Sequence, residues 1–128
     1  MWNIYWNNEK VSIDVIDKVI DVINKLNFEY MRKKPILVQV ENEFGDRMCI
    51  GVGNCAGYSV IDFLPCNSYF SKSVEGENIG DGVICFYMED YESEFCISNT
   101  IQYDTAINVL KTFICKNMLD KSVNWIDD

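Results

Sequence analysis

The sequence contains no histidine among its 128 residues. Histidine is the side chain that most often serves as a general base and as a ligand for transition metals. Its absence excludes Ser–His and Cys–His nucleophile pairs and removes the usual ligand of zinc and iron sites. An enzyme built on this chain would need carboxylates, lysines or a lone thiol, so we expect no catalytic residues and no bound cofactor.

The cysteines are spaced too widely for a metal site. No C-x-x-C pair occurs among the six, which are Cys49, Cys55, Cys66, Cys85, Cys96 and Cys115. Zinc ribbons and related sites need such pairs. The N-terminal segment also lacks the basic start and the small-residue cleavage site of a secretion signal, so a disulfide framework is not expected. We therefore expect buried free thiols and no metal.

Long apolar runs are missing as well. No segment approaches the roughly 20 consecutive apolar residues that a membrane-spanning helix needs. Together with the missing secretion signal, this predicts a cytoplasmic protein that does not bind membranes. The chain is 48% hydrophobic and 24% charged, as ordinary globular domains are. Its length is typical of one domain, so we interpret residues 1–128 as a single domain.

Basic residues are scarce, especially in the second half of the chain. The net charge is −9, and residues 65–128 hold eleven acidic but four basic side chains. Between Glu75 and Glu94 there are seven carboxylates and no lysine or arginine. Direct binding to nucleic acid is not expected, because neutralising phosphates needs a basic face. The expected partner is instead a basic protein.

Two segments have the apolar spacing of amphipathic helices, at about residues 12–30 and 103–118. Apolar residues repeat at intervals of three and four in both: Ile13, Ile16, Val19, Ile20, Ile23 and Leu26 in the first, and Tyr103, Ala106, Ile107, Leu110, Phe113 and Ile114 in the second. Ser12 is the expected N-cap of the first helix, and Pro35 follows its end.

Between and before these helices the sequence favours strands. The expected strands are residues 2–6, 35–44, 47–53, 58–65, 83–90 and 94–100. The segment 66–82 is expected to be a long irregular loop, of the kind that often carries function. We expect Trp125 to return to the core. The predicted fold is α+β, with an antiparallel sheet of about five to six strands packed against two main helices.

The stretch Gly51-Val52-Gly53-Asn54-Cys55-Ala56 matches the G-x-G-x-x-G/A fingerprint of dinucleotide-binding loops. That fingerprint requires a helix directly after the glycines, because the helix N-terminus holds the pyrophosphate. Here Gly57 is followed by β-branched and aromatic residues, and Pro65 comes too soon for a helix. Strand, turn and strand are predicted, with Gly53, Asn54 and Gly57 supplying positive φ angles at the turn. We expect no bound nucleotide.

The order of motifs over residues 47–128 resembles immunity protein family one of bacterial polymorphic toxin systems. The matching segments are "CIGVGNCAGYSVIDFL", the loop "SYFSKSVEGENIGDG", the acidic "CFYMEDYESEF", the helix region "ISNTIQYDTAINVLKTF" and the closing "VNWIDD". Residues 1–46 match less well. The resemblance implies an α+β fold and a function without catalysis. The family's members bind and neutralise a cognate toxin, often a nucleic-acid deaminase.

A toxin that acts on nucleic acid needs a basic groove for phosphates, which an acidic inhibitor can occupy. We expect a monomer that forms a 1:1 complex with such a toxin domain. Two alternatives remain open. One is a general acidic protein-binding adaptor, as in the cell-wall-regulator-like immunity superfamily. The other is a small enzyme that uses carboxylates or Cys55, which would need a cation to activate the thiol.

The candidate toxin-binding residues fall in two segments that offer aromatic anchors, hydroxyls and negative charge. They are Tyr69, Phe70, Ser71, Ser73, Glu75, Glu77 and Asp81 in the loop, and Glu89, Asp90, Tyr91, Glu92 and Glu94 around a predicted hairpin turn. The alternative for Tyr69 and Phe70 is that they fill the core and hold the loop down. The alternative for the turn is an ordinary solvated hairpin tip.

Overall fold

The computed structural model describes residues 1–128 and has two α-helices, eleven strands and one 3-10 turn. The helices are α1 (Ile16–Tyr30) and α2 (Tyr103–Lys116), and the turn is η1 (Ile97–Asn99). The strands are β1 (Trp2–Trp6), β2 (Glu9–Ile13), β3 (Ile36–Glu41), β4 (Arg47–Val52), β5 (Tyr58–Ser59), β6 (Ile61–Leu64), β7 (Lys72–Val74), β8 (Val83–Met88), β9 (Tyr91–Cys96), β10 (Ile101–Gln102) and β11 (Trp125–Asp127). Neither helix is long and apolar enough to cross a membrane.

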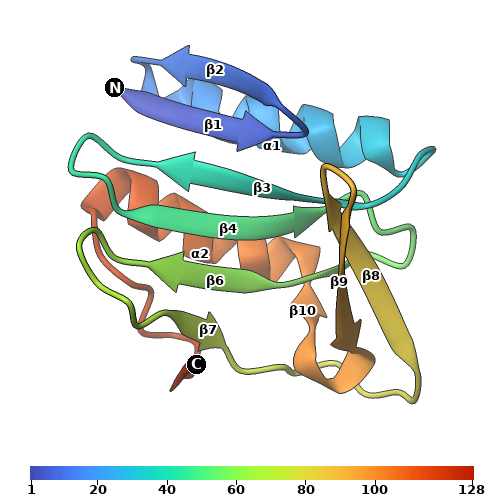
Figure 1. Ribbon diagram of the computed structural model, residues 1–128. Helices are drawn as coiled ribbons and strands as arrows, with labels where there is room; N and C mark the ends of the chain where they lie inside the picture. Colours follow the sequence, from blue (N-terminus) through green and yellow to red (C-terminus); the bar gives the residue numbers. More distant parts are fainter.

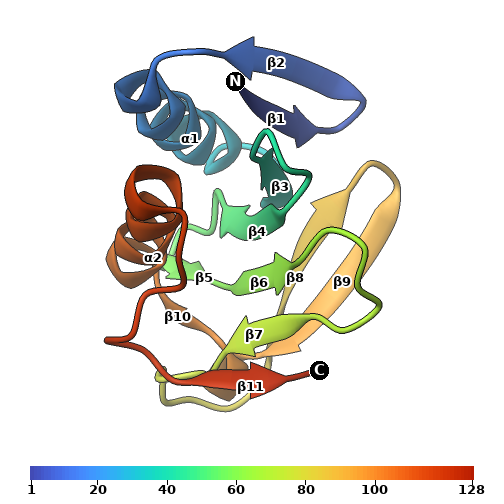
Figure 2. The ribbon, with the colours of Figure 1, turned by 90° about the vertical axis from the view of Figure 1, so that its left-hand side faces the viewer.

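Seven strands form one antiparallel sheet in the order β11-β7-β6-β4-β3-β1-β2. Both helices cover one face of this sheet, and the β8–β9 hairpin crosses the opposite face (Figures 1 and 2). The hairpin joins the sheet through a single parallel bridge between Ile36 of β3 and Tyr87 of β8. The short strands β5 and β10 pair separately. The fold is therefore α+β, as predicted, with helices and hairpin on opposite sides of the sheet.

The main core lies between the sheet and the two helices. Alternate residues of β3 and β4 point toward the helices, as the period of two in a strand requires. The residues of these strands in the main core are Ile36, Val38, Val40, Met48, Ile50 and Val52, and they share it with Val19, Ile23 and Leu26 of α1 and Ala106, Val109, Leu110 and Phe113 of α2. The predicted stripe of α2 is confirmed from Ala106 to Ile114, and that of α1 from Val19 to Leu26. The first two residues of the predicted α1 stripe were wrong, because Ile13 lies in β2 and Ile16 is exposed.

A second, smaller core holds the hairpin against the other face of the sheet. Phe86 of β8 is fully buried among Leu37, Cys49 and Val60, and its ring meets Phe95 of β9 edge-on at 5.9 Å. A Cβ at Gly51 would lie 2.7 Å from the Phe86 ring. Gly51 is therefore the position at which the sheet backbone admits this aromatic side chain.

The glycine-rich stretch is a turn between strands, as predicted. Gly51 lies in β4, and the chain continues into β5 rather than into a helix. Gly53 and Gly57 have positive φ angles of 88° and 79°, whereas Asn54, which was also expected to have one, does not. The Asn54 side chain closes the turn by accepting a hydrogen bond from the Ala56 N–H at 2.9 Å. No helix N-terminus is present here to hold a pyrophosphate.

The start of the first helix was predicted wrongly. Residues 9–13 form strand β2, which pairs with β1, so the helix begins at Ile16 rather than near Ser12. Ser12 is not the N-cap. Its hydroxyl donates to the Asn3 side chain at 2.7 Å across the strand pair, and Val15 occupies the cap position without a side-chain bond. The cross-strand partner outweighs the local capping preference of serine.

The sheet is also larger than the predicted five to six strands. Nine strands belong to the main sheet and two to the small one. The segment 66–82 is not wholly irregular, because Lys72–Val74 forms β7 and pairs with β11. β9 begins at Tyr91 and ends at Cys96, so the strand expected over 94–100 lies earlier in the chain. Trp125 is half-buried against the core and donates its Nε1–H to the Asp120 carbonyl at 2.8 Å.

All six cysteines are free thiols. Cys49 is buried in the second core, and burial raises the pKa of its thiol far above the usual range. Cys85 is half-buried, and the other four are exposed. The expectation of buried thiols was therefore wrong for all but Cys49, because the other five lie in loops, on the outer face of the hairpin or on the solvent-exposed side of α2.

Candidate protein interface

The β8–β9 hairpin presents the second group of candidate residues. Its turn consists of Glu89 and Asp90, and Glu89 has a positive φ of 56° that non-glycine residues seldom adopt. The Glu89 N–H donates to the Asn7 side chain in the β1–β2 turn at 3.0 Å. The hairpin tip is thus tied to the edge of the sheet, and Glu89, Asp90 and Tyr91 are exposed there.

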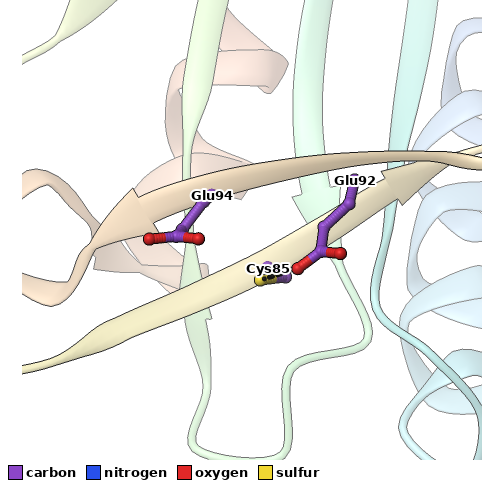
Figure 3. A group of neighbouring side chains, drawn as sticks. All are labelled: Cys85, Glu92 and Glu94. Carbon is purple, nitrogen blue, oxygen red and sulfur yellow. Dashed lines mark hydrogen bonds between the residues drawn. The ribbon is translucent and has the colours of Figure 1, made fainter.

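Glu92 and Glu94 lie on the outer face of the hairpin, directly across from Tyr87 and Cys85. The Cys85 Sγ–H donates to Glu92 Oε1 at 2.9 Å (Figure 3). This hydrogen bond, followed by burial and the charges of both glutamates, raises the pKa of Cys85 to about 11. The thiol is therefore protonated at neutral pH, which is the opposite of what a nucleophilic cysteine needs.

Three side chains of the hairpin have the geometry of a metal-binding group, which the cysteine spacing did not indicate. Donor atoms of Cys85, Glu92 and Glu94 lie within 4.8 Å of one another. Metal binding there would require the thiol to lose its proton, against the raised pKa of Cys85. The geometry is explained without an ion by the thiol–carboxylate hydrogen bond.

The loop between β6 and β7 exposes the two candidate aromatic anchors. Tyr69 is fully exposed and Phe70 is 79% exposed, so neither fills the core. The hydroxyls of Ser71 and Ser73 are already engaged within the protein, since Ser71 donates to the Asp128 carboxylate at 2.6 Å. The structure thus leaves the aromatic side chains free for a partner but not the two serines.

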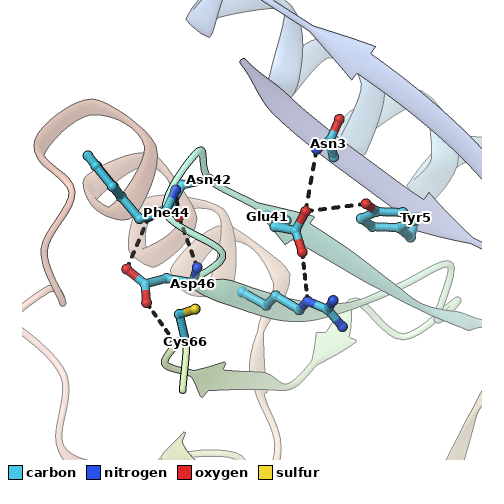
Figure 4. A network of polar contacts seen from close by, with 8 residues as sticks. Asn3, Tyr5, Glu41, Asn42, Phe44, Asp46 and Cys66 are labelled. Atoms are coloured by element: carbon cyan, nitrogen blue, oxygen red, sulfur yellow. Dashed lines mark hydrogen bonds and ion pairs between the residues drawn. The ribbon is translucent and has the colours of Figure 1, made fainter. Parts of the chain in front are cut away.

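A buried polar network holds the start of this loop in place (Figure 4). Asn42 is buried, and its Oδ1 accepts the N–H groups of Phe44 and Asp46, each at 2.9 Å. The Asp46 carboxylate in turn accepts the Cys66 N–H at 2.8 Å. The turn between β3 and β4 therefore positions the chain a few residues before Tyr69.

The acidic tract 75–94 does not form one continuous surface. Glu75 and Glu77 lie in the connection from β7 to β8, where their N–H groups donate to the carbonyls of Asn124 and Thr100. Asp81, in the same connection, is exposed. The hairpin carboxylates form a separate group, and the β6–β7 loop lies at the opposite end of the strands from the hairpin (Figure 1).

Loop and hairpin nevertheless project from the same face of the sheet, the one opposite the helices (Figure 2). This face also carries a polar cluster around Glu41 at the end of β3. Glu41 accepts hydrogen bonds from Arg47 Nε at 2.9 Å and from Asn3 and Tyr5 (Figure 4). Burial alone would raise the pKa of Glu41, but these hydrogen bonds and the Arg47 charge outweigh it and lower the pKa.

Two hollows flank the hairpin on this face. The larger, of about 330 Å³, lies beside the hairpin tip and is lined by residues that include Tyr5, Lys10, Gln39, Arg47 and Glu89. The smaller, of about 210 Å³, lies where Phe95 of β9 faces β6, β7 and β11. The face that carries the hairpin is therefore hollowed at two places and is not flat.

The smaller hollow contains a crowded pair of carboxyl groups. The single hydroxyl of Ser73 lies 2.5 Å from an Asp62 oxygen and 2.6 Å from an Asp128 oxygen. One hydroxyl proton serves one of the two contacts, so the other contact needs a proton on a carboxyl group. Burial, assisted by the Asp128 charge, raises the pKa of Asp62 despite the Ser73 hydrogen bond.

Several residues of this face were missed at the level of sequence. Cys85 and Tyr87 share an outer face with Glu92 and Glu94, which the alternation along residues 83–88 indicates once that strand is placed. Asp62 gave no signal, because its neighbours Ser73 and Asp128 come from other strands. The same holds for Arg47 and its partner Glu41, which face each other across β3 and β4.

No protein-family model matches the chain, and no curated protein is significantly similar to it.

Proposed function

We propose that the protein is an immunity protein that binds a cognate bacterial toxin, a nucleic-acid deaminase, and neutralises it without catalysis. The proposal combines the resemblance of residues 47–128 to immunity protein family one with the chemistry of the face that carries the hairpin. The toxin domain is the basic partner, and the complex contains one copy of each protein.

The observation that carries this proposal is a set of exposed carboxylates without cationic partners. None of the three ion pairs in the structure involves a carboxylate of the tract from Glu75 to Glu94. The charge of these seven groups is therefore not neutralised internally, and the hairpin group is raised above the sheet. A surface of this kind attracts a basic protein and speeds its association.

The exposed aromatic residues of the β6–β7 loop complement this charge. Buried aromatic side chains concentrate binding energy at interfaces, whereas exposed ion pairs contribute about 0–1 kcal/mol each. Tyr69 and Phe70 are exposed, and the β6–β7 loop that holds them lies on the face that also carries the hairpin (Figure 2). In the proposed complex the carboxylates steer the toxin, and the two aromatic side chains hold it.

The direct test is co-expression with the toxin domain encoded beside the protein. We expect the untagged protein to co-purify with a tagged toxin domain at equal stoichiometry and to relieve its toxicity. A toxin domain that neither co-purifies with the protein nor loses toxicity would reject the proposal and favour the adaptor alternative.

A matched pair of variants tests the role of the hairpin. The triple substitution Glu89→Gln, Glu92→Gln and Glu94→Gln removes three negative charges from the hairpin. The triple substitution Asp14→Asn, Asp17→Asn and Asp21→Asn removes three exposed charges at α1. We expect weaker capture of the toxin with the hairpin variant than with the α1 variant. Equal effects would mean that net charge, and not the hairpin, governs binding.

A further inference from the structure

One edge of the hairpin is open. β9 pairs with β8 and with no other strand. No backbone or side-chain group outside the hairpin is hydrogen-bonded to the backbone of Tyr91–Cys96. Open edges of six residues without proline are templates for an added strand, and natural proteins guard them with charge. The side chains along β9 therefore determine what can pair there.

Two hydrogen bonds establish which backbone groups face this open edge. The Tyr87 N–H donates to the Pro35 carbonyl at 2.9 Å, so it points toward β3 and away from β9. At the other end of the hairpin, the Ile97 N–H donates to the Gly82 carbonyl at 3.1 Å. Bonded and non-bonded pairs alternate along an antiparallel ladder. Both bonds agree that Glu92, Glu94 and Cys96 occupy non-bonded positions.

The free N–H and C=O groups of β9 consequently belong to Glu92, Glu94 and Cys96. An added antiparallel strand would form two backbone hydrogen bonds with each of these residues. Its side chains opposite Glu92 and Glu94 would stand about 4.5–5.5 Å away at Cβ, on the outer face of the hairpin. The two glutamates are two residues apart and unpaired with any cation, so they favour lysine or arginine at alternate positions of the added strand.

We propose that β9 is a docking edge for an extended basic segment of the protein partner, which adds to the hairpin as an antiparallel strand with cationic side chains opposite Glu92 and Glu94. That this partner is the toxin rests on the proposed function. A second copy of this chain is a poor occupant, because pairing two β9 edges would bring the carboxylates of one copy against those of the other. Charge thus excludes self-association at this edge while admitting a basic strand.

The first test uses two peptides of identical composition and the full-length protein labelled with ¹⁵N. The probe is acetyl-Thr-Val-Lys-Val-Lys-Val-Thr-amide, whose lysines share one face of a strand, and the control is acetyl-Thr-Val-Lys-Lys-Val-Val-Thr-amide. We expect the probe to shift the amide signals of Glu92, Glu94 and Cys96 and to slow their hydrogen exchange. The control should bind about fivefold more weakly, since it aligns one cross-strand ion pair instead of two.

A form of the probe with N-methyl groups on both lysines separates strand addition from simple charge attraction. It keeps the charge, but its two lysines lack N–H donors and carry methyl groups that would clash with the β9 carbonyls. It therefore cannot pair as a strand and should not protect the edge amides. Equal binding of all three peptides, or shifts confined to other surfaces, would overturn the proposal. The proposal would also be overturned if, without peptide, the edge amides became more protected from hydrogen exchange as the protein concentration rises. That result would show that a second copy of the chain occupies the edge.

The second test reverses the charges. Glu92→Lys with Glu94→Lys should switch the preference to a peptide in which glutamates replace the two lysines. Glu75→Lys with Glu77→Lys makes the same charge change at the same spacing outside the hairpin, and it should keep the preference for the lysine probe. A switch in both variants would reject a defined edge. Toxin co-purification is measured separately. If the toxin co-purifies but protects amides outside β9 from hydrogen exchange, the docking edge alone is rejected. If the peptide binds β9 but the toxin does not bind the protein, the proposed function alone is rejected.

Discussion

Replacing Phe86 with alanine should loosen the hairpin and lower the free energy of unfolding substantially. Phe86 is fully buried in the second core, and its ring contacts Phe95 edge-on at 5.9 Å. The surface beneath it is Gly51, which has no side chain to fill the space left by the ring. β4 is held on both sides by β3 and β6, so its backbone cannot move in to close the cavity.

Substitutions of this kind cost about 3–5 kcal/mol when the site cannot collapse. The hairpin itself is attached through one bridge to β3 and one hydrogen bond to Asn7, so it can settle partly into the gap. We therefore expect a loss near the lower limit, about 3 kcal/mol. The amides of β8 should also exchange faster than those of β4.

The assay is urea denaturation of the wild type, Phe86→Ala and Phe70→Ala, with the free energy of unfolding taken from the midpoint and slope. Phe70→Ala is the matched control, because Phe70 is 79% exposed and its loss should change stability by less than about 0.5 kcal/mol. A loss below about 1 kcal/mol for Phe86→Ala, or equal losses in both variants, would refute the assignment of the hairpin to a second core.

Three further predictions concern other parts of the molecule. Because the pKa of Asp62 is raised in the folded protein, the free energy of unfolding of the wild type should fall as pH rises from 3.8, the ordinary pKa of aspartate, through the folded-state pKa. In denaturation at several pH values, Asp62→Asn should show a flatter dependence and be more stable at neutral pH. Gly76→Ala would drive a Cβ into the Ser98 carbonyl oxygen and should lower the melting temperature more than Gly57→Ala, which strains a positive φ but whose Cβ meets no atom within 4 Å. Tyr69→Ala should speed dissociation of the toxin, at a cost on the order of 2 kcal/mol, and leave the thermal unfolding curve unchanged.

The helices were predictable because their signal is local. Apolar residues at intervals of three and four define α2 almost to its end at Lys116, and Tyr30 ends α1 as expected. The start of α1 failed for a non-local reason. Glu9–Ile13 has a single buried residue, Ile13, and becomes a strand because β1 lies alongside it. No periodicity within five mostly exposed residues can reveal that partner.

β7 and β11 show the same limit more strongly. Each has three residues, and each becomes a strand through a partner about fifty positions away in the chain. Charge and exposed aromatic residues were predictable for the candidate interface, because composition and turn signals are visible in the sequence. Which carboxylates lie together was not, because the backbone of Glu75 and Glu77 is held by the carbonyls of Asn124 and Thr100, while the pairing of β8 with β9 positions the hairpin group.

The two loop serines illustrate the converse error. Hydroxyls in a polar loop were expected to contact a partner, but Ser71 and Ser73 are bonded to carboxylates of Asp62 and Asp128. Side-chain hydrogen bonds across strands depend on pairing that the sequence does not display. Gly51 is a related case, since its role is to make room for an aromatic ring some thirty-five residues later in the chain.

The central claim is that the acidic hairpin steers a basic toxin onto this protein. The most direct measurement is the association rate with the toxin domain across salt concentrations, by stopped-flow fluorescence, for the wild type and the Glu89→Gln, Glu92→Gln, Glu94→Gln variant. Screening shortens the range of charge interactions from about 10 Å at 0.1 M salt to about 3 Å at 1 M. We expect the wild-type rate to be fast at low salt and to fall steeply as salt rises, and the variant to be slower with a weaker dependence. A rate that does not depend on salt and is unchanged in the variant would contradict the account.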